Sequence, residues 1–315
     1  MWISHSTRKV NDMLSVVIPA YNEEKMIART AESITSLLDN NDIDHELLFV
    51  NDGSSDATWR CIEEAHEADL RIRGISFSRN FGKEAAVFAG LTECKGDCAV
   101  VIDCDLQHPP EKIIEMYRLW EQGYEIVEGV KADRGKESAA HAFAAKCFYR
   151  IISDATDIDM SNASDFKLLD RKAIHALINM TERDAFFRAL SSWVGFRTTQ
   201  VSYDVREREA GESNWSTGAL IRYAISNITS YTSLPLQVVT ILGMVMLVLG
   251  VVISVQSLYK WYTGSALEGF TTVIILQCFS SSFIMISLGI IGYYISKIYE
   301  GIQNRPRYII SEKIE

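Results

Sequence analysis

Two long stretches without a charged residue constrain the fold of this chain more than any other feature. No Asp, Glu, Lys or Arg occurs at residues 223–259 or 269–296. Within these stretches, residues 236–258 and 271–296 would form helices roughly 34 and 39 Å long, against about 30 Å of bilayer hydrocarbon. We therefore expect two transmembrane helices within residues 234–298. Two buried helices of a soluble protein are the alternative.

The flanking residues predict the orientation of these helices. The first 13 residues are polar and lack an apolar core, so we expect no signal peptide and both ends of the chain on one side. Lys297, Arg305, Arg307 and Lys313 follow the second stretch, whereas the short connection between the stretches carries one Lys and one Glu. Positive charge favours the cytoplasmic side, which indicates a cytoplasmic body and a cytoplasmic tail.

The first 130 residues alternate between apolar runs and helical patterns. Runs typical of buried strands lie at residues 14–20, 45–51, 71–78, 97–105 and 126–130, and helical patterns separate the first four. Strands that alternate with helices of 10–15 residues predict parallel β-α-β units, hence an α/β fold with a mostly parallel sheet. In such sheets, ligands bind beyond the carboxyl ends of the strands.

The rest of the chain adds further helices. Residues 141–155 read as a helix of the body. Residues 217–233 carry apolar side chains at helical spacing just before the first apolar stretch, which indicates an amphipathic helix at the membrane interface. A helix in a soluble core is the alternative for this segment.

Several functional classes are disfavoured. The chain has neither a G-x-G-x-x-G after its first strand nor a G-x-x-x-x-G-K-[ST] motif, so a dinucleotide-dependent dehydrogenase and a P-loop NTPase are both unexpected. A net charge of −10 without a basic stripe argues against a nucleic-acid partner. The apolar stretches carry no charge, which argues against a channel or transporter. The six cysteines form no C-x-x-C pair and are expected to be reduced core residues.

The segment VVIDCDLQHPPE, residues 100–111, contains the most informative polar residues. If the extended conformation of the fourth strand continues, Asp103, Asp105 and Gln107 point to one face. Carboxylate and amide oxygens suit Mg²⁺ or Mn²⁺, with water and phosphate filling the other positions. Pro109 and Pro110 would end the strand and open the next helix. A solvated turn, with Asp as a helix cap, is the alternative.

Polar residues also follow the other predicted strands. Asp52 could hydrogen-bond the edge of a nucleotide base, and the backbone at Pro19–Tyr21 could hold the base and ribose. Both segments also have the composition of ordinary turns and caps, which is the alternative explanation.

Six motifs in order resemble those of one enzyme family. VVIPAYNEE, VNDGSSDAT, SRNFGKEAA, DCDLQHPPE, DFKLLDR and REREAGESNWS are followed by the two apolar stretches. This arrangement resembles the polyprenyl-phosphate glycosyltransferases, which are family 2 enzymes with the Rossmann-like GT-A fold. They include the dolichol-phosphate mannose synthases and, more similar to this chain, the bacterial bactoprenol (undecaprenyl-phosphate) glucosyltransferases.

The resemblance implies roles for individual residues. The nucleotide sugar would be held by Pro19, Ala20, Tyr21, Glu23, Asp52, Gly82, Lys83, Asp103 and Arg206. The metal would be held by Asp103, Asp105 and Gln107, which would make Asp103 and Asp105 catalytic as well. Asp165, in DFKLLDR, is placed like a residue assigned as catalytic in related enzymes, although it could instead orient the sugar or the acceptor.

The chain departs from the family pattern in the segment around Gly211. Relatives tend to have Lys after Gly-[Glu/Asp]-[Ser/Thr], whereas this chain has Asn214. The Gln-x-x-Arg-Trp motif of processive relatives is absent, which predicts the transfer of one sugar per turnover. Cations are also needed for the acceptor phosphate, and its candidate partners are Lys131, Arg134, Arg206 and Ser213. For Lys131 and Arg134, a solvated charged loop is the alternative.

The expected reaction follows from the chemistry of the acceptor. A phosphate monoester is largely dianionic near neutral pH and can attack the anomeric carbon directly, which inverts that carbon. We expect glucose transfer from UDP-glucose to undecaprenyl phosphate on the cytoplasmic face of a bacterial inner membrane. UDP-GlcNAc, GDP-mannose or a modified pentose donor, or a non-catalytic nucleotide-sugar-binding scaffold, are the alternatives.

The chain is expected to have four regions. The regions are a cytoplasmic GT-A domain (1–216), the interfacial helix (217–233), the two transmembrane helices (234–298) and a cytoplasmic tail (299–315). A homo-oligomer, such as a tetramer, is expected.

Overall fold

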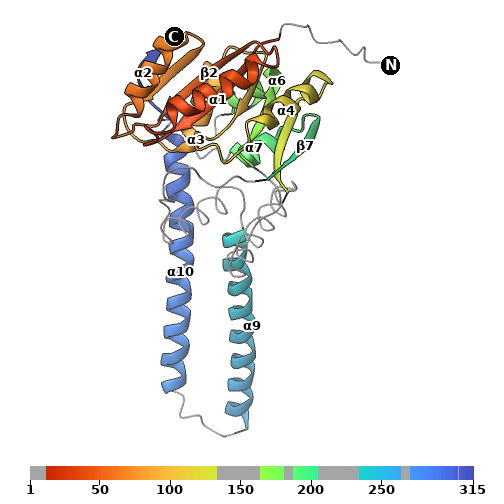
Figure 1. Ribbon diagram of the computed structural model, residues 1–315. Helices are drawn as coiled ribbons and strands as arrows, with labels where there is room; N and C mark the ends of the chain where they lie inside the picture. Colours follow the sequence, from red (N-terminus) through yellow and green to blue (C-terminus); the bar gives the residue numbers. More distant parts are fainter. Residues whose placement is uncertain (1–11, 133–163, 181–186, 205–233, 264–269, 304) are drawn as a thin grey trace. The chain divides into compact units, whose positions relative to one another are not determined.

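The computed structural model of the chain describes residues 12–132, 164–180, 187–204, 234–263, 270–303 and 305–315 (Figure 1). The chain divides into two compact units. One comprises Met1–Leu220 together with Pro306–Glu315, and the other comprises Ile221–Arg305. The interfacial helix expected at 217–233 and the helix expected at 141–155 lie outside the described residues.

The first unit contains one sheet of eight strands in the order β7-β5-β6-β4-β1-β2-β3-β8. The strands are β1 (Leu14–Ala20), β2 (His45–Asn51), β3 (Ile72–Phe77), β4 (Cys98–Val101), β5 (Ile126–Lys131), β6 (Lys167–Asp170), β7 (Thr198–Tyr203) and β8 (Ile310–Ile314). Every residue of β2 is buried, as are all residues of β1 but Pro19. Such burial on both faces is typical of central parallel strands covered by helices.

Most strands run in one direction, as the sequence predicts. β1 pairs in parallel with β2 and β4, β2 with β3, and β5 with β7. β6 runs antiparallel between β4 and β5, and β8 runs antiparallel beside β3. Because β6 is reversed, its first residues lie at the edge where its neighbours end. This edge is called the carboxyl rim below.

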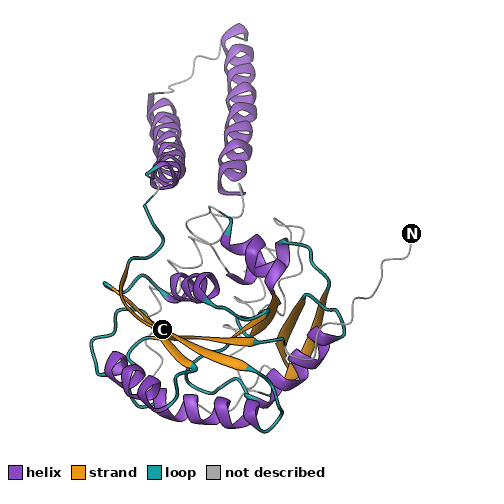
Figure 2. Ribbon diagram, turned by 90° about the horizontal axis from the view of Figure 1, so that it is seen from above, coloured by secondary structure: helices purple, strands orange, loops and turns teal. Residues whose placement is uncertain are grey.

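Helices cover both faces of the sheet (Figure 2). They are α1 (Ile27–Asp39), α2 (Thr58–Ala68), α3 (Lys83–Glu93), α4 (Glu111–Glu121), α6 (Arg171–Ile178) and α7 (Phe187–Trp193). α1, α2 and α4 contribute to the core on the side of Val16 and Ile18. On the other side, a Cβ added to Gly90 of α3 would lie 2.2 Å from Val17 Cγ1, so glycine permits close helix–sheet contact. α6 packs on β4 and β6 and contacts α3 and α7.

The second unit contains two long apolar helices, α9 (Leu234–Tyr262) and α10 (Phe270–Ile302). Pro235–Gln256 and Phe279–Ile302 are long and apolar enough to cross a membrane, and neither window is buried within the structure. A core helix of a soluble protein would be covered by other elements. The two helices therefore agree with the spans expected from the sequence, although α10 continues past residue 296.

The end of the chain differs from the tail expected at residues 299–315. Ile302 is still helical, and Ile310–Ile314 form β8 against β3, with Gly74 opposite Ile314. The contact is reinforced by Trp59 Nε1, which donates to Glu312 Oε2 at 3.0 Å. Ile310 and Ile314 at its two ends are half-buried, whereas the three polar residues between them are exposed, which suits a short strand at the edge of a sheet.

Candidate active site

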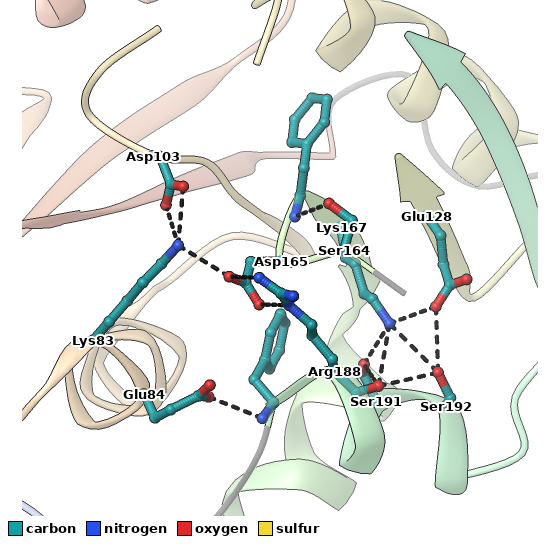
Figure 3. A network of polar contacts seen from close by, with 12 residues as sticks. Lys83, Glu84, Asp103, Glu128, Ser164, Asp165, Lys167, Arg188, Ser191 and Ser192 are labelled. Carbon is teal, nitrogen blue, oxygen red and sulfur yellow. Dashed lines mark hydrogen bonds and ion pairs between the residues drawn. The ribbon is translucent and has the colours of Figure 1, made fainter. Parts of the chain in front are cut away.

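The carboxyl rim brings two acidic residues together through the register of β4 and β6. Val101 pairs with Lys167 in this antiparallel ladder. Continuing the same register by two residues places Asp103 opposite Asp165, although neither belongs to a strand. Lys83, the first residue of α3, lies between them: its Nζ is 2.6 Å from Asp103 Oδ1 and 3.0 Å from Asp165 Oδ2 (Figure 3).

Asp165 has a second cationic partner, Arg188 of α7. Arg188 Nε donates to Asp165 Oδ1 at 2.6 Å and Nη2 donates to Oδ2 at 2.8 Å, which is a bidentate contact. Burial alone would raise the pKa of Asp165, but Lys83 and Arg188 hold that pKa well below its usual range. Asp165 is therefore ionised near neutral pH and is a poor proton acceptor, which favours an orienting role over that of a general base.

Lys83 remains charged in this setting. Burial lowers the pKa of its ammonium group, but Asp103 and Asp165 outweigh this effect and raise the pKa above its ordinary value. The side chain is 43% exposed, against 29% for Asp103 and 11% for Asp165. The cluster thus presents an accessible cation at its outer side and a deeper carboxylate behind it.

The metal ligands expected from VVIDCDLQHPPE do not share one strand face. β4 ends at Val101, a turn follows at residues 104–105, and Leu106 has a φ of 53°, so the extended conformation does not continue. Asp105 is 5% exposed and its Oδ1 accepts the Gln107 N–H at 3.1 Å. Asp103, Asp105 and Gln107 therefore do not point to one face of a continued strand, and that prediction was wrong. Pro110, as expected, directly precedes α4.

The donor set remains suitable for a hard divalent cation. The described part of the chain holds no group of three or more His, Cys, Asp or Glu side chains that could bind a metal. Mg²⁺ and Mn²⁺ sites, however, commonly use one or two carboxylates, with substrate phosphates and water completing the shell. Asp103, Asp105 and Gln107 supply oxygen donors of this kind, and the ammonium group of Lys83 lies beside Asp103.

Asp52 connects two loops of the rim. It is 3% exposed, and its oxygens accept the backbone N–H groups of Phe81 at 2.7 Å and Gly82 at 2.9 Å. Burial raises the pKa of Asp52. Next to it, a Cβ added to Gly53 would lie 2.3 Å from the carbonyl carbon of Arg79. The loops after β2 and β3 are thus fixed against each other, and Asp52 has a structural role beyond the expected contact with a base.

The loop after β1 joins the same rim. Asn22 N–H donates to Ser54 Oγ at 2.9 Å, and Glu23 N–H donates to Thr58 Oγ1 at 2.8 Å. Ala20 is buried at the end of β1, whereas the Tyr21 side chain is 46% exposed. Pro19 and Ala20 therefore end β1, and Tyr21 and Glu23 lie in the loop that is tied to the segment following Asp52.

The candidates for the acceptor phosphate are only partly described. Lys131 is the exposed last residue of β5. Arg134, Arg206, Ser213 and Asn214 lie outside the described residues.

Four charged residues near Asp165 were not expected from the sequence: Glu84, Glu128, Lys167 and Arg188. Glu84 Oε2 accepts the Phe187 N–H at 2.9 Å, and Lys167 Nζ binds Glu128 Oε1. One signal was present, because Glu128 in IVEGV and Lys167 in FKLL are opposite charges within apolar runs. Buried charges are normally paired, so this pattern predicts a buried ion pair.

Comparison with known proteins identifies the family. The family model described as "Glycosyl transferase family 2" matches residues 15–178. The chain belongs to this family. A Bacillus subtilis protein named "Uncharacterized glycosyltransferase YkcC" is 38% identical over 300 residues, which cover 95% of this chain and 93% of the relative. The bactoprenol glucosyl transferase of Shigella phage SfII is 33% identical over 307 residues, covering 95% and 97%.

Solved structures agree with the fold. Glucosyl-3-phosphoglycerate synthase from Mycobacterium tuberculosis, crystallised with Mn²⁺, uridine diphosphate and phosphoglyceric acid, matches with a TM-score of 0.51 and 23% identity. The match covers 70% of this chain and 78% of the synthase. At this identity the likeness concerns the fold, and it confirms the α/β fold of GT-A type expected from the sequence.

Proposed function

We propose that this family 2 glycosyltransferase moves a single glucose from UDP-glucose to undecaprenyl phosphate, with inversion, on the cytoplasmic face of a bacterial inner membrane. The observation that carries this proposal is the Asp103–Lys83–Asp165 cluster at the carboxyl rim of a chain that also has two long apolar helices. The polyprenyl acceptor and the glucose donor are supported by relatives named bactoprenol glucosyl transferase, which match over nearly their whole length.

The proposed reaction needs no proton transfer before bond formation. An oxygen of the acceptor phosphate forms a bond to the anomeric carbon while the bond from that carbon to the diphosphate breaks, and its electron pair leaves on the diphosphate oxygen. The phosphate is largely dianionic near neutral pH, so no general base is required. This agrees with the low pKa of Asp165, which is held ionised by two cations.

In this scheme the residues of the rim bind and orient the reactants. The loops at Pro19–Glu23 and Asp52 would hold the nucleoside, and Gly82 and Lys83 would lie near the diphosphate. Asp165, fixed by Arg188, would orient the sugar or the acceptor. Aligning two anionic reactants in a fixed geometry lowers the barrier by removing translational and rotational freedom.

Asp103, Asp105 and Gln107 are the proposed ligands of Mg²⁺ or Mn²⁺. When bound, the divalent ion would stabilise the charge that develops on the leaving diphosphate. Because Lys83 binds the same Asp103 carboxylate, Lys83 would have to share or release that partner when the metal and donor are present. Lys131 is the described candidate for the acceptor phosphate, and Arg134, Arg206 and Ser213 are proposed with it. Assembly as a homo-oligomer remains a prediction.

The test is a transfer assay with the full chain in detergent or in membranes. Purified protein, undecaprenyl phosphate, MnCl₂ or MgCl₂ and radiolabelled UDP-glucose are expected to give a labelled product that partitions into organic solvent. UDP-GlcNAc, GDP-mannose and a pentose donor are compared in parallel. The proposal is contradicted if the folded protein labels the lipid with none of these donors. If it labels the lipid only with a donor other than UDP-glucose, the reaction class stands and the transferred sugar is that of the other donor.

A further inference from the structure

Lys167 is a fully buried ammonium group that neither the sheet nor the core requires. It is 0% exposed, at the first position of β6. Its Nζ binds Glu128 Oε1 of the neighbouring strand and donates to Ser191 Oγ at 2.7 Å. Burying a charge is costly unless it is paired and hydrogen-bonded. A protein with apolar residues in place of a buried ion pair is often as stable as the original or more stable. The pair therefore needs a reason other than stability.

The partners of Lys167 indicate that reason. Besides Ser191, Nζ lies 3.5 Å from the carbonyl oxygen of Arg188 and 3.5 Å from Ser192 Oγ, and all three residues belong to α7 (Figure 3). Ser192 Oγ also lies 3.4 Å from Glu128 Oε1. The buried pair thus contacts one turn of α7. That turn includes Arg188, whose guanidinium group binds Asp165.

The other contacts that the structure describes for α7 include apolar burial. α7 has seven residues, and a helix this short is marginal without tertiary contacts. Phe187, Ala189, Leu190 and Ser191 are buried, and the N–H of Phe187 is bound by Glu84. Apolar contacts tolerate small sliding movements, whereas hydrogen bonds to an ammonium fix direction and distance.

We propose that Lys167, paired with Glu128, is a positioning residue that sets α7 so that Arg188 meets Asp165 in its bidentate geometry. The chain also links the two sites directly, since Lys167 is the first residue of β6 and Asp165 lies two residues before it. The effect on turnover rests on the proposed function, but the effect on the Arg188–Asp165 contact does not.

The decisive variant removes both charges, Lys167→Met with Glu128→Leu. A single Lys167→Met change would leave the Glu128 carboxylate buried without its partner and could prevent folding, whereas the double change replaces the pair with apolar volume. The matched control is Arg73→Met with Glu46→Leu, a pair with 8% and 6% side-chain exposure near the starts of β3 and β2, at the edge of the sheet away from the carboxyl rim. Both double variants lose one buried ion pair, but only the first loses the contacts to α7.

The first readout does not depend on activity. In the ¹H–¹⁵N spectrum of the full chain labelled at arginine, the Arg188 Nε–H signal of the wild type should exchange slowly with water because it is bound to Asp165. We expect this protection to be lost in the Lys167/Glu128 double variant and kept in the control. Arg188→Lys assigns the signal.

The second readout is kinetic. We expect kcat to fall by about 10²-fold in the Lys167/Glu128 double variant, as for other displacements of about 1 Å near the chemistry, with KM for the nucleotide sugar unchanged. Lys167→Arg, which keeps the charge beside Glu128, should recover part of kcat. If Lys167 contributed only to stability, the folded double variant would not show a lower kcat with an unchanged KM. Lys167→Arg would then have no loss of kcat to restore.

The outcomes distinguish the two proposals. If the folded double variant keeps both the protected Arg188 signal and the wild-type kcat, the positioning role of Lys167 is refuted. If the wild type transfers no sugar from any donor, the proposed function fails, while the Arg188 signal still decides the positioning role.

Discussion

The ammonium group of Lys83 separates two carboxylates that the sheet register would otherwise bring face to face, and Lys83→Met removes it. Nζ lies 2.6 Å from Asp103 Oδ1 and 3.0 Å from Asp165 Oδ2, so the two oxygens are at most about 6 Å apart. At that separation two unit charges repel by about 3 kcal/mol at an effective dielectric constant of about 20. Asp103 is 29% exposed, so water screens part of this repulsion. We expect a net loss of about 2 kcal/mol in the free energy of unfolding, or about 4–8 °C in Tm for a domain of this size.

The assay is thermal unfolding of the full chain in detergent, followed by intrinsic fluorescence in the presence of EDTA. The loss should be larger at pH 8 than at pH 4. Without Lys83 the pKa of Asp165 rises, so the folded variant takes up a proton at higher pH than the wild type and is relatively less stable as the pH increases. Added Mn²⁺ should restore more stability to Lys83→Met than to the wild type if a divalent ion binds beside Asp103.

Lys112→Met is the matched control for this experiment. Lys112 binds Glu115 at 2.8 Å on the exposed face of α4, a pair expected to contribute less than about 1 kcal/mol. If Lys83→Met and Lys112→Met unfold at the same temperature in EDTA, Lys83 does not offset repulsion between the two carboxylates, and the electrostatic account of the cluster is refuted.

Three further predictions concern other residues of the rim. Asp105→Asn should lower turnover by about 10²-fold if it supports the leaving group, as measured from initial rates with saturating donor, and an unchanged rate would remove it from the metal site. Burial and the neighbouring Asp165 raise the pKa of Glu84 to about 7. The chemical shift of the Phe187 amide, which Glu84 accepts, should therefore change near that pH in the wild type and stay constant in Glu84→Gln. Since the folded state holds this proton, the wild type should lose stability relative to Glu84→Gln as the pH rises through 7, and a constant difference would contradict the shift. Gly53→Ala, at a φ of 65° and against the Arg79 backbone, should lower Tm by about 4 °C or more, because a non-glycine residue there costs about 2 kcal/mol.

The periodicity of the sequence predicts most of the central sheet because its strands are short apolar runs between amphipathic helices. The run at 14–20 coincides with β1, and the polar ends of β1, β2 and β3 meet at the rim as parallel pairing requires. The resemblance correctly indicated the family from motifs that lie mainly at these strand ends.

Other parts of the site depend on contacts between distant segments, which local patterns do not contain. The positive φ of Leu106 breaks the alternation after Asp103, although leucine rarely adopts this conformation and gives no signal in the sequence. The meeting of Lys83, Asp165 and Arg188 depends on the reversed direction of β6 and on the position of α7. Neither can be read from a single segment.

The position of β8 has a consequence for work with this protein in solution. The chain leaves the sheet domain after Leu220 and re-enters it at Pro306, so the two apolar helices are an insertion within that domain and not an extension of it. A soluble fragment that stopped before α9 would lack β8 and would leave the N–H and C=O groups of β3 without their partner strand. An open strand edge is a template for aggregation. A soluble sheet domain should therefore be made as a deletion of the insertion, with residues 306–315 rejoined through a linker.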